Sequence, residues 1–336
     1  MTLSDAWVAE RSDDGGVRLV RRRVPVPEPA EGELLIRVAW SSVNYKDALA
    51  ATIPDRIIRR YPLVPGIDLA GTVEASRDSR FREGDAVIAT GYELGVLRHG
   101  GFAEWAVVPA DWAVPLPEGL TLREAMALGT AGFTAALCVR ALEHYGLRPD
   151  RGPVLVTGAT GGVGSIAVQI LSGLGYDVVA ATGKPDARPY LLALGASEIV
   201  PREELTAGEP KPLRSQRWAA AVDTVGGGVL AAVLASIRYG GAVAACGLAG
   251  GAELATTVYP FILRGVGLLG IDSVYTDMGV RKEIWRLLAG PWKPPRLDLI
   301  AADIMMDDIP QLIKRMLAGH FRGRAVVHMK ETAYSN

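Results

Sequence analysis

The sequence predicts an α/β protein in which a β-rich N-terminal domain precedes a doubly wound parallel sheet. Two observations support this class. Short β-rich segments separated by glycine and proline occupy the first third of the chain, and from about Leu122 helices alternate with apolar strands. Strands that alternate with helices of about 10–12 residues are typical of a parallel sheet with crossover connections. We therefore expect two domains of different architecture.

The first third of the chain contains six expected strands. The glycine and proline residues between them favour turns, and so an antiparallel and partly barrel-like domain. The expected strands cover residues 7–10, 17–27, 33–43, 69–76, 84–90 and 100–109.

The remainder of the chain alternates between the two kinds of element, and residues 208–218 are the segment most typical of an exposed loop. The expected helices cover residues 122–147, 165–174, 187–195, 229–240, 281–290 and 309–321. The expected strands cover residues 153–158, 177–182, 198–200, 219–225, 242–247 and 323–330.

Composition excludes several classes of protein. Among 336 residues, 36 Lys and Arg balance 37 Asp and Glu, which gives no electrostatic basis for binding nucleic acid or a membrane surface. Two cysteines exclude a disulfide scaffold and fit a reducing cytoplasm. The N-terminus lacks the pattern of a secretory signal, and the apolar stretch 125–139 is shorter than the ~20 residues of a membrane span. We expect a cytoplasmic protein.

A glycine-rich segment, residues 158–164, follows the apolar strand Val154-Leu155-Val156 and precedes a helix. A tight strand–glycine–helix junction directs free backbone N–H groups and the positive end of a helix toward one point, which suits a pyrophosphate. Glycines at 161 and 164 allow close approach of a ligand and close packing of helix on strand. A purely structural turn is the alternative, but the β–α–β context favours a dinucleotide site.

The residues after the second strand of this unit indicate which dinucleotide binds. Sites for NAD carry an acidic residue here, which binds the ribose 2′-hydroxyl. This strand instead ends at Thr182, followed by Gly183 and Lys184, with Arg188 nearby. Cations without a carboxylate suit a 2′-phosphate, so the sequence favours NADPH; a solvated surface lysine is the alternative for Lys184.

Several motifs, in order along the whole chain, carry a family resemblance: VNYKDAL, VPGIDLAGTV, GDAVIATG, GGFAEWAVVPA and VLVTGATGGVG. Together they resemble the medium-chain dehydrogenase/reductase superfamily. Finer features resemble its zinc-free quinone-oxidoreductase branch and, within it, the NADPH-dependent acryloyl-CoA reductase family. The resemblance implies a GroES-like catalytic domain over 1–124, a Rossmann NADPH-binding domain over 125–270, and a segment over 271–336 that returns to the catalytic domain.

The resemblance also bears on metal binding. Zinc alcohol dehydrogenases of this superfamily have a cysteine at the position of Asn44 and a His-Glu pair at the position of Ile67-Asp68. An amide and an isoleucine are not ligands for Zn²⁺. The four-cysteine structural zinc lobe is also missing, because neither Cys138 nor Cys246 has a second cysteine close by in the sequence. We expect no metal, and both cysteines to be core residues.

The resemblance places Tyr45 beside the nicotinamide and the substrate, where its hydroxyl would polarise a carbonyl or relay a proton; a half-buried packing tyrosine is the alternative. It places Asn44 where it would orient substrate or ribose, and Asp47 where it would hold the loop. Arg322 and Arg324, before the last strand, have positions that often contact nicotinamide or phosphate in this family. The full set expected around the cofactor is Tyr45, Thr130, Thr160, Gly161, Gly162, Val163, Gly164, Ser165, Thr182, Gly183, Lys184, Arg188, Arg202, Leu248, Ile262, Ser273 and Arg322.

Several of these residues could instead have purely structural roles. Thr130 could simply cap or pack a helix, and Arg202 could be an exposed surface arginine. Arg56, Arg59 and Arg60 form one local cationic cluster, which would suit the phosphates of a CoA thioester, although a solvated surface run is the alternative.

The function that follows is NADPH-dependent reduction of acryloyl-CoA to propanoyl-CoA. Without zinc, hydride would add to the β-carbon of an unsaturated thioester, and the resulting enolate would take a proton at the α-carbon. The alternatives are an NADPH:quinone or enone oxidoreductase and, more remotely, a non-catalytic NADPH- or RNA-binding relative. The apolar segment 256–274 resembles an edge strand through which family members pair, so we expect a homodimer.

Overall fold

The structure is a computed structural model that describes residues 2–329 and divides into two compact units. Unit 1 contains residues 2–130, Val274–Ala289 and 301–329, and unit 2 contains Ala131–Ser273 and Gly290–Ile300. The first division falls at Thr130, six residues after the expected boundary at 124. Residues 271–273 and 290–300 belong to unit 2, although we expected the whole segment 271–336 to return to the first domain.

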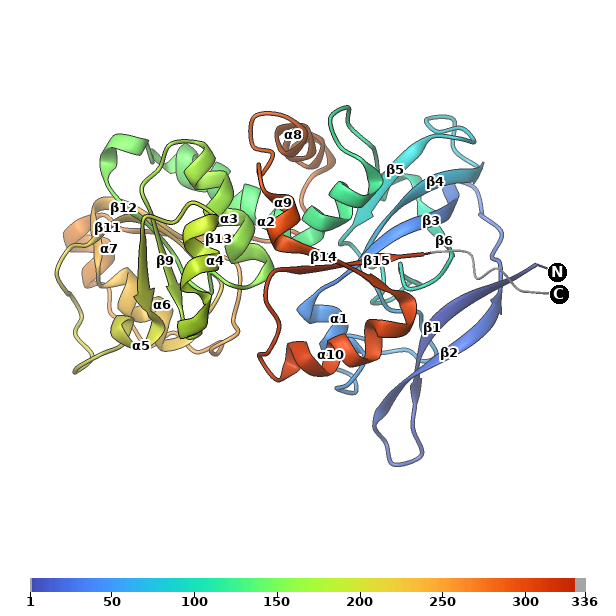
Figure 1. The fold of residues 1–336 in the computed structure, drawn as a ribbon, viewed down its shortest axis with the longest axis horizontal. Coiled ribbons are helices and arrows are strands. Elements are labelled where there is room, and N and C mark those ends of the chain that lie inside the picture. The colour runs from blue at the N-terminus through green and yellow to red at the C-terminus, as the bar shows by residue number, and fades with distance from the viewer. Residues whose placement is uncertain (1, 330–336) are drawn as a thin grey trace. The chain divides into compact units, whose positions relative to one another are not determined.

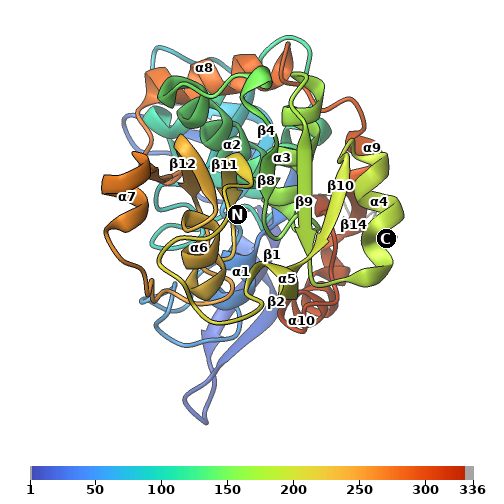
Figure 2. The same ribbon diagram turned by 90° about the vertical axis from the view of Figure 1, so that its left-hand side faces the viewer.

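Unit 2 is built on a six-stranded sheet in the order β10-β9-β8-β11-β12-β13, and every neighbouring pair is parallel. Figure 2 shows β12, β11, β8, β9 and β10 side by side. The strands are β8 Val154–Val156, β9 Val178–Thr182, β10 Glu198–Pro201, β11 Trp218–Asp223, β12 Ile237–Ala245 and β13 Gly267–Gly270. The helices are α3 Gly162–Gly173, α4 Arg188–Ala193, α5 Arg202–Leu205, α6 Gly227–Leu234, α7 Tyr259–Arg264 and α9 Leu297–Ile300.

The expected parallel sheet of this unit is confirmed, with two differences in its elements. Residues 237–240 belong to β12, although the sequence predicts that they continue the preceding helix. Their β-branched and aromatic residues, Ile237 and Tyr239, suit a strand. Most of the loop 208–218 is exposed as expected, but Leu213, Arg214 and Arg217 are half-buried, and Trp218 is buried and begins β11.

The long helix α2, Leu122–Tyr145, departs from the expectation for the apolar stretch 125–139. With 24 residues it is long and apolar enough to cross a membrane, so the argument from length was wrong. Because 83% of its most apolar window is buried inside the protein, the helix serves as a core helix. It is not straight: Gly129 interrupts it with φ 51° and ψ −154°, values that an L-residue rarely adopts.

Unit 1 is a β-rich unit, as expected. Its main sheet has the order β14-β15-β3-β4-β5-β7, with β6 also paired to β3, while β1 and β2 form the long hairpin in Figure 1. The strands are β1 Leu3–Arg11, β2 Val17–Pro25, β3 Glu33–Val43, β4 Asp68–Ser76, β5 Ala86–Thr90, β6 Trp105–Pro109, β7 Ala113–Pro115, β14 Ala301–Met305 and β15 Arg324–His328. The helices besides the first part of α2 are α1 Tyr45–Ala50, α8 Met278–Ala289 and α10 Ile309–Leu317.

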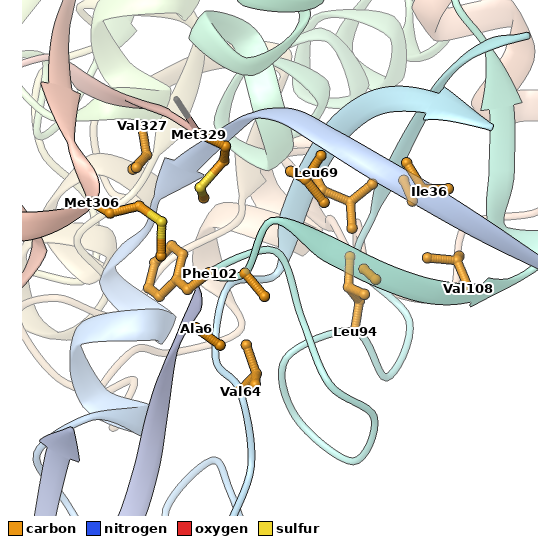
Figure 3. Packing of buried hydrophobic residues seen from close by; sticks show 14 of the residues in the cluster. Ala6, Ile36, Val64, Leu69, Leu94, Phe102, Val108, Met306, Val327 and Met329 are labelled. Carbon is orange, nitrogen blue, oxygen red and sulfur yellow. The ribbon is translucent and has the colours of Figure 1, made fainter. Parts of the chain in front are cut away.

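The end of the chain returns to this unit. Strand β15 pairs antiparallel with β3, so that Ala325 faces Val43, and β14 continues the sheet in parallel with β15. Residues 301–329 therefore lie in unit 1. Lys330, the last residue of the expected strand 323–330, lies outside the described residues. Figure 3 shows the consequence for packing, because Met306, Val327 and Met329 lie in one apolar core with Phe102 and Leu69. The C-terminal segment therefore completes the core of the first unit.

Candidate functional site

The glycine-rich segment of unit 2 contains the first turn of a helix. Helix α3 begins at Gly162, three residues earlier than expected, with the exposed Gly161 before it. The first N–H groups of a helix have no partner within that helix, so those of Gly162, Val163 and Gly164 are available to an anion. The turn therefore combines free donors with the positive end of a 12-residue helix.

Polar contacts below the segment hold its backbone in place. The hydroxyl of Thr157 donates to Oδ1 of the buried Asp223 at 2.6 Å, and the hydroxyl of Thr224 donates to the carbonyl of Thr157 at 3.0 Å. The second oxygen of Asp223 accepts the N–H of Gly226 at 2.7 Å. Burial raises the pKa of Asp223. These bonds fasten the end of β8 to the end of β11, so the glycine-rich turn rests on a fixed base.

Close packing explains the last glycine of the segment. A Cβ at Gly164 would lie 2.4 Å from the carbonyl oxygen of Gly158 and 2.7 Å from Cα of Ala159. Ser165, which we expected to contact the cofactor, has a fully buried side chain. Its hydroxyl donates to the carbonyl of Ala159 at 3.0 Å and accepts from Tyr190 at 2.8 Å. The hydroxyl of Ser165 therefore supports the turn from beneath, and a contact between Ser165 and the cofactor stays a prediction.

The expected 2′-phosphate site lies at the carboxyl ends of β9 and β10. Thr182 ends β9 opposite Pro201, so the next residues, Gly183 and Arg202, follow paired strand ends. A Cβ at Gly183 would lie 3.0 Å from the guanidinium group of Arg202, which also contacts the carboxylate of Glu203 at 3.2 Å. The backbone N–H of Lys184 donates to the hydroxyl of Thr182 at 3.0 Å. This arrangement places the guanidinium group of Arg202 beside a glycine that follows β9.

The other residues expected around the cofactor occupy different positions. Leu248 and Ser273 each lie three residues beyond the carboxyl end of a strand, β12 and β13 respectively, which is the sheet edge where such folds bind ligands. Arg188 is exposed at the first residue of α4. Ile262 is 68% exposed on α7, a connecting helix, so it does not share the strand-end position of the others.

A buried ionic network is the main polar feature of unit 1. Arg324 at the start of β15 is 3% exposed, and Asp68 at the start of β4 is fully buried. The guanidinium group of Arg324 donates to Oδ1 of Asn44 at 2.8 Å and to the Ser42 hydroxyl at 2.7 Å, and lies 3.5 Å from Oδ2 of Asp68. The Asn44 amide and the Ser42 hydroxyl donate to the same carboxylate oxygen, at 2.8 and 2.7 Å. Asn44 thus links cation and anion.

The kink of α2 places a helix end on the same carboxylate. After Gly129, the backbone N–H of Thr130 donates to Oδ2 of Asp68 at 2.9 Å, and its hydroxyl donates to Oδ1. A Cβ at Gly129 would lie 2.4 Å from Asp68 Oδ2 and 2.6 Å from Nη2 of Arg324, so only glycine fits. We expected Thr130 to approach the nicotinamide. Its hydroxyl donates to Asp68, which fits the alternative of a capping role, and its approach to the nicotinamide stays a prediction.

Asp47 holds the start of α1, as expected. One of its oxygens accepts the N–H of Asn44 at 2.8 Å, and the other accepts the N–H of Ile67 at 3.0 Å. Burial, together with the negative charge of Asp68, raises the pKa of Asp47 to about 7. Burial also lowers the pKa of Arg324, although the two carboxylates oppose this. Burial beside Asp68 therefore disfavours the charged form of Asp47.

Tyr45 differs from the residues around it because it is exposed. Its side chain is 52% exposed at the first position of α1, directly after the buried Asn44. The network thus fixes the backbone from which Tyr45 extends, while the phenol itself faces solvent. Asn44, by contrast, uses both ends of its amide within the network, so its first role is to position α1.

The buried ion pair of Asp68 and Arg324 was not predicted from the sequence. Asp68 entered it only as a lost metal ligand, and Arg324 only beside Arg322, which is exposed. The available signal was a pair of charged residues within apolar strand segments, PGIDLAG and GRAVVH, because buried charges require partners. Arg56, Arg59 and Arg60 are all exposed on the loop after α1.

The two cysteines, Cys138 and Cys246, come from distant parts of the chain and meet in unit 2. Cys138 is buried, and its thiol is hydrogen-bonded to that of Cys246. This bond and burial raise the pKa of Cys138, so its reactive thiolate form is disfavoured. Cys246 is half-buried, and its thiol donates to the carbonyl of Asp223 at 3.4 Å. For Cys138, the expected core role is confirmed.

Comparison with known protein families gives two matches. Residues 30–118 match a family described as alcohol dehydrogenase GroES-like domain, and residues 162–289 match one described as zinc-binding dehydrogenase. These matches confirm the GroES-like and Rossmann-like architectures of the two units.

Individual relatives align over nearly the whole chain. The putative quinone oxidoreductase YhfP of Bacillus subtilis is 52% identical over 98% of this chain and 99% of its own. The crystal structure of Bacillus subtilis yhfP with NAD bound has a TM-score of 0.95 and 51% identity, over 98% of this chain and 100% of that one. The acrylyl-CoA reductase AcuI of Ruegeria pomeroyi is 48% identical over 97% of this chain and 99% of its own. The yhdH oxidoreductase of Salmonella enterica, crystallised with NADP, is 48% identical with a TM-score of 0.93, over 97% of this chain and 100% of that one.

The description "zinc-binding dehydrogenase" raises the question of whether these residues suit zinc. Asn44 and Ile67 are not zinc ligands, and both oxygens of Asp68 already accept hydrogen bonds. A guanidinium cation lies beside that carboxylate. Within residues 2–329, no group of three or more His, Cys, Asp or Glu is placed to hold a metal ion. The residues at the expected position therefore do not fit zinc.

Gly164→Ala is expected to lower the free energy of unfolding by about 1–3 kcal/mol, because the added Cβ would collide with the Gly158 carbonyl. Gly173→Ala, at the other end of α3, is the matched control, because nothing lies within 4 Å of its added Cβ. It should leave stability unchanged or raise it slightly. Urea denaturation of the two variants measures the difference, and equal midpoints would contradict the close packing of the turn.

Proposed function

Because the chain belongs to the medium-chain dehydrogenase/reductase superfamily, in its quinone-oxidoreductase-like branch, we propose that it uses NADPH to reduce acryloyl-CoA to propanoyl-CoA. The observation that carries this proposal is the buried network of Asp68, Arg324 and Asn44. Asn44 and Asp68 of this network stand where the family resemblance puts metal ligands of zinc-dependent members, and the neighbouring Tyr45 is exposed. Reduction of an activated C=C bond requires oxyanion stabilisation and a proton, and a phenol can supply both.

NADPH fits the residues of unit 2. The N–H groups of Gly162, Val163 and Gly164 would hold its diphosphate, and Lys184 and Arg202, with Arg188, would hold the 2′-phosphate. The open space at Gly161, where a Cβ would meet only the Gly158 carbonyl at 3.3 Å, suits close approach of phosphate. When bound, NADPH supplies the hydride that adds to the β-carbon of the substrate.

Residues of unit 1 would stabilise the thioester carbonyl oxygen and supply the proton for the α-carbon. The Tyr45 hydroxyl would donate a hydrogen bond to the thioester carbonyl, whose oxygen gains negative charge as the β-carbon is reduced. The α-carbon of the enolate then takes a proton, for which the same hydroxyl is our candidate donor. Asn44 and Asp47 would position Tyr45 by fixing the first turn of α1. The C=C bond becomes a single bond by gaining one hydride and one proton.

A quinone is the second candidate substrate. The relative with 52% identity bears the name of a putative quinone oxidoreductase, and its substrate class needs only an apolar slot beside the cofactor. An acyl-CoA, in contrast, also brings phosphates that require cations. The two substrate classes can therefore be separated by turnover.

We also propose that two copies associate through unit 2 and that the protein acts in the cytoplasm. Within residues 2–329, β13 pairs only with β12 and so forms an edge of the sheet. An edge strand with exposed apolar side chains favours pairing with another chain. Leu268 of β13 is 37% exposed, and α7 presents Ile262 and Leu263, which are 68% and 55% exposed. We propose that the exposed side chain of Ile262 contacts the second copy of the chain and not the cofactor.

The substrate is tested by mixing the enzyme and NADPH with acryloyl-CoA or with 1,4-benzoquinone and following NADPH absorbance by stopped flow. Acryloyl-CoA should be reduced, and Tyr45→Phe should lower kcat roughly 100-fold, as expected when a general acid is removed. Tyr45→Phe keeps the ring, so NADPH affinity serves as its internal control. Turnover of the quinone alone would reject the thioester, and unchanged kcat in Tyr45→Phe would reject Tyr45 as the donor.

Lys184→Glu should raise the Kd for NADPH at least roughly tenfold and change the Kd for NADH much less, because only NADPH carries the 2′-phosphate that this charge reversal repels. Fluorescence titration with each nucleotide measures both constants. Lys211→Glu, in the exposed loop 208–218, makes the same charge change and serves as the control. An unchanged ratio of the two constants would reject the assignment of Lys184.

Light scattering at low concentration should give twice the chain mass of 35.6 kDa. Leu268→Arg should give the single-chain mass, because it places a charge on the proposed edge-to-edge contact. A dimer that survives this substitution would place the interface elsewhere.

A further inference from the structure

The loop that follows α1 carries three arginines in five positions. Arg56, Arg59 and Arg60 are exposed, and they lie between the end of α1 at Ala50 and the end of the loop at Pro62. Since the whole chain has a formal charge of −1, this density of positive charge is local. A cluster of this kind is often only solvated surface, so its structural context decides its meaning.

The backbone of this loop is anchored at several points. Ile58 is fully buried and packs in a small apolar cluster with Ala9, Ala50 and Leu63. The N–H of Ala9 donates to the carbonyl of Leu63 at 2.8 Å, which fastens the end of the loop to β1. The arginines on both sides of Ile58 are therefore presented from a fixed support, as a binding site requires.

The acidic and basic side chains of the loop differ in whether they have partners within the protein. The one carboxylate of the loop, Asp55, is paired with Arg11, whose guanidinium group also lies 4.8 Å from the centre of the Tyr61 ring. Within residues 2–329, none of the three exposed arginines forms a hydrogen bond or an ion pair through its side chain. The carboxylate of Asp55 is therefore neutralised by Arg11, and the three guanidinium groups are available to bind an anionic ligand.

We propose that Arg56, Arg59 and Arg60 bind the phosphate groups of a coenzyme A thioester, an inference that rests on the proposed function. Guanidinium groups form bidentate hydrogen bonds with phosphate, and three of them match the several phosphates of the adenosine end of coenzyme A. The NADPH phosphates have their own donors in unit 2, at the glycine turn and around Gly183, so this cluster is not needed for the cofactor.

The position of the loop in the chain fits a long substrate. Tyr45 is the first residue of α1, and the loop starts at the other end of that helix, six residues or about 9 Å away. A ligand that contacts both must have a long arm between its reactive carbonyl and its phosphates. The pantetheine arm of coenzyme A has this form, whereas a small quinone or a free enone has neither the arm nor the phosphates.

The test compares acryloyl-CoA with acryloyl-pantetheine, which has the same thioester but lacks the phosphates. The wild type should show a lower KM for acryloyl-CoA, and Arg59→Ala/Arg60→Ala should raise that KM roughly tenfold, so that the two values converge. Rising salt should weaken acryloyl-CoA binding in the wild type and affect the double variant less. Arg82→Ala is the matched control, because Arg82 belongs to the same unit, is 90% exposed and lies in the turn between β4 and β5.

A binding measurement keeps this inference separate from the proposed function. Isothermal titration of coenzyme A into enzyme saturated with NADPH should show binding that weakens in the double variant and not in Arg82→Ala. If acryloyl-CoA is not reduced but coenzyme A still binds through these arginines, the inference holds and the proposed reaction is wrong. If coenzyme A does not bind, or if the double variant changes the KM for both thioesters equally, the inference is overturned.

Discussion

The buried ion pair of Asp68 and Arg324 is the constraint on which the first unit depends. Asp68 begins β4, Arg324 begins β15, Asn44 precedes α1, and Thr130 follows the kink in α2, so one carboxylate connects four elements from distant parts of the chain. Removal of one member of a buried ion pair typically costs about 3–5 kcal/mol, because the other charge is left without compensation. The pair therefore also fixes the place of Tyr45, which has no buried contact of comparable strength of its own.

A different constraint governs the second unit. There the ligand-binding turn is held by a buried carboxylate, Asp223, and by the absence of side chains at Gly158 and Gly164. A Cβ at Gly158 would lie 2.2 Å from the Thr224 hydroxyl oxygen, and its φ is +58°. Glycine is thus required beneath the turn for packing and at its surface for access, and these two requirements explain why four glycines occur within seven residues.

Periodicity and turn residues predicted most of the elements because they depend on local patterns. The parallel sheet, its order of strands and helices, and the glycine turn follow from such patterns. The hydrogen bonds of Thr130 and Ser165 could not be predicted in this way, because local patterns do not show which residues the fold brings beside them. Thr130 donates to Asp68, and Ser165 contacts Ala159 and Tyr190. The kink at Gly129 was missed for the same reason, since the helical pattern continues through it. Local patterns thus predicted the elements better than the contacts between them.

Burial separates the cationic side chains of this protein into groups with different roles. Arg324 is enclosed and saturated with acceptors, so its charge stabilises the fold and is unavailable to a ligand. Arg202 and the half-buried Lys184 flank a glycine at the edge of a parallel sheet, where a small anion can displace water at little cost in ordering. Arg56, Arg59 and Arg60 are exposed on an anchored loop, which suits a flexible, multiply charged group more than a fixed phosphate. The same residue type therefore serves the fold or a ligand according to how many acceptors the chain itself provides.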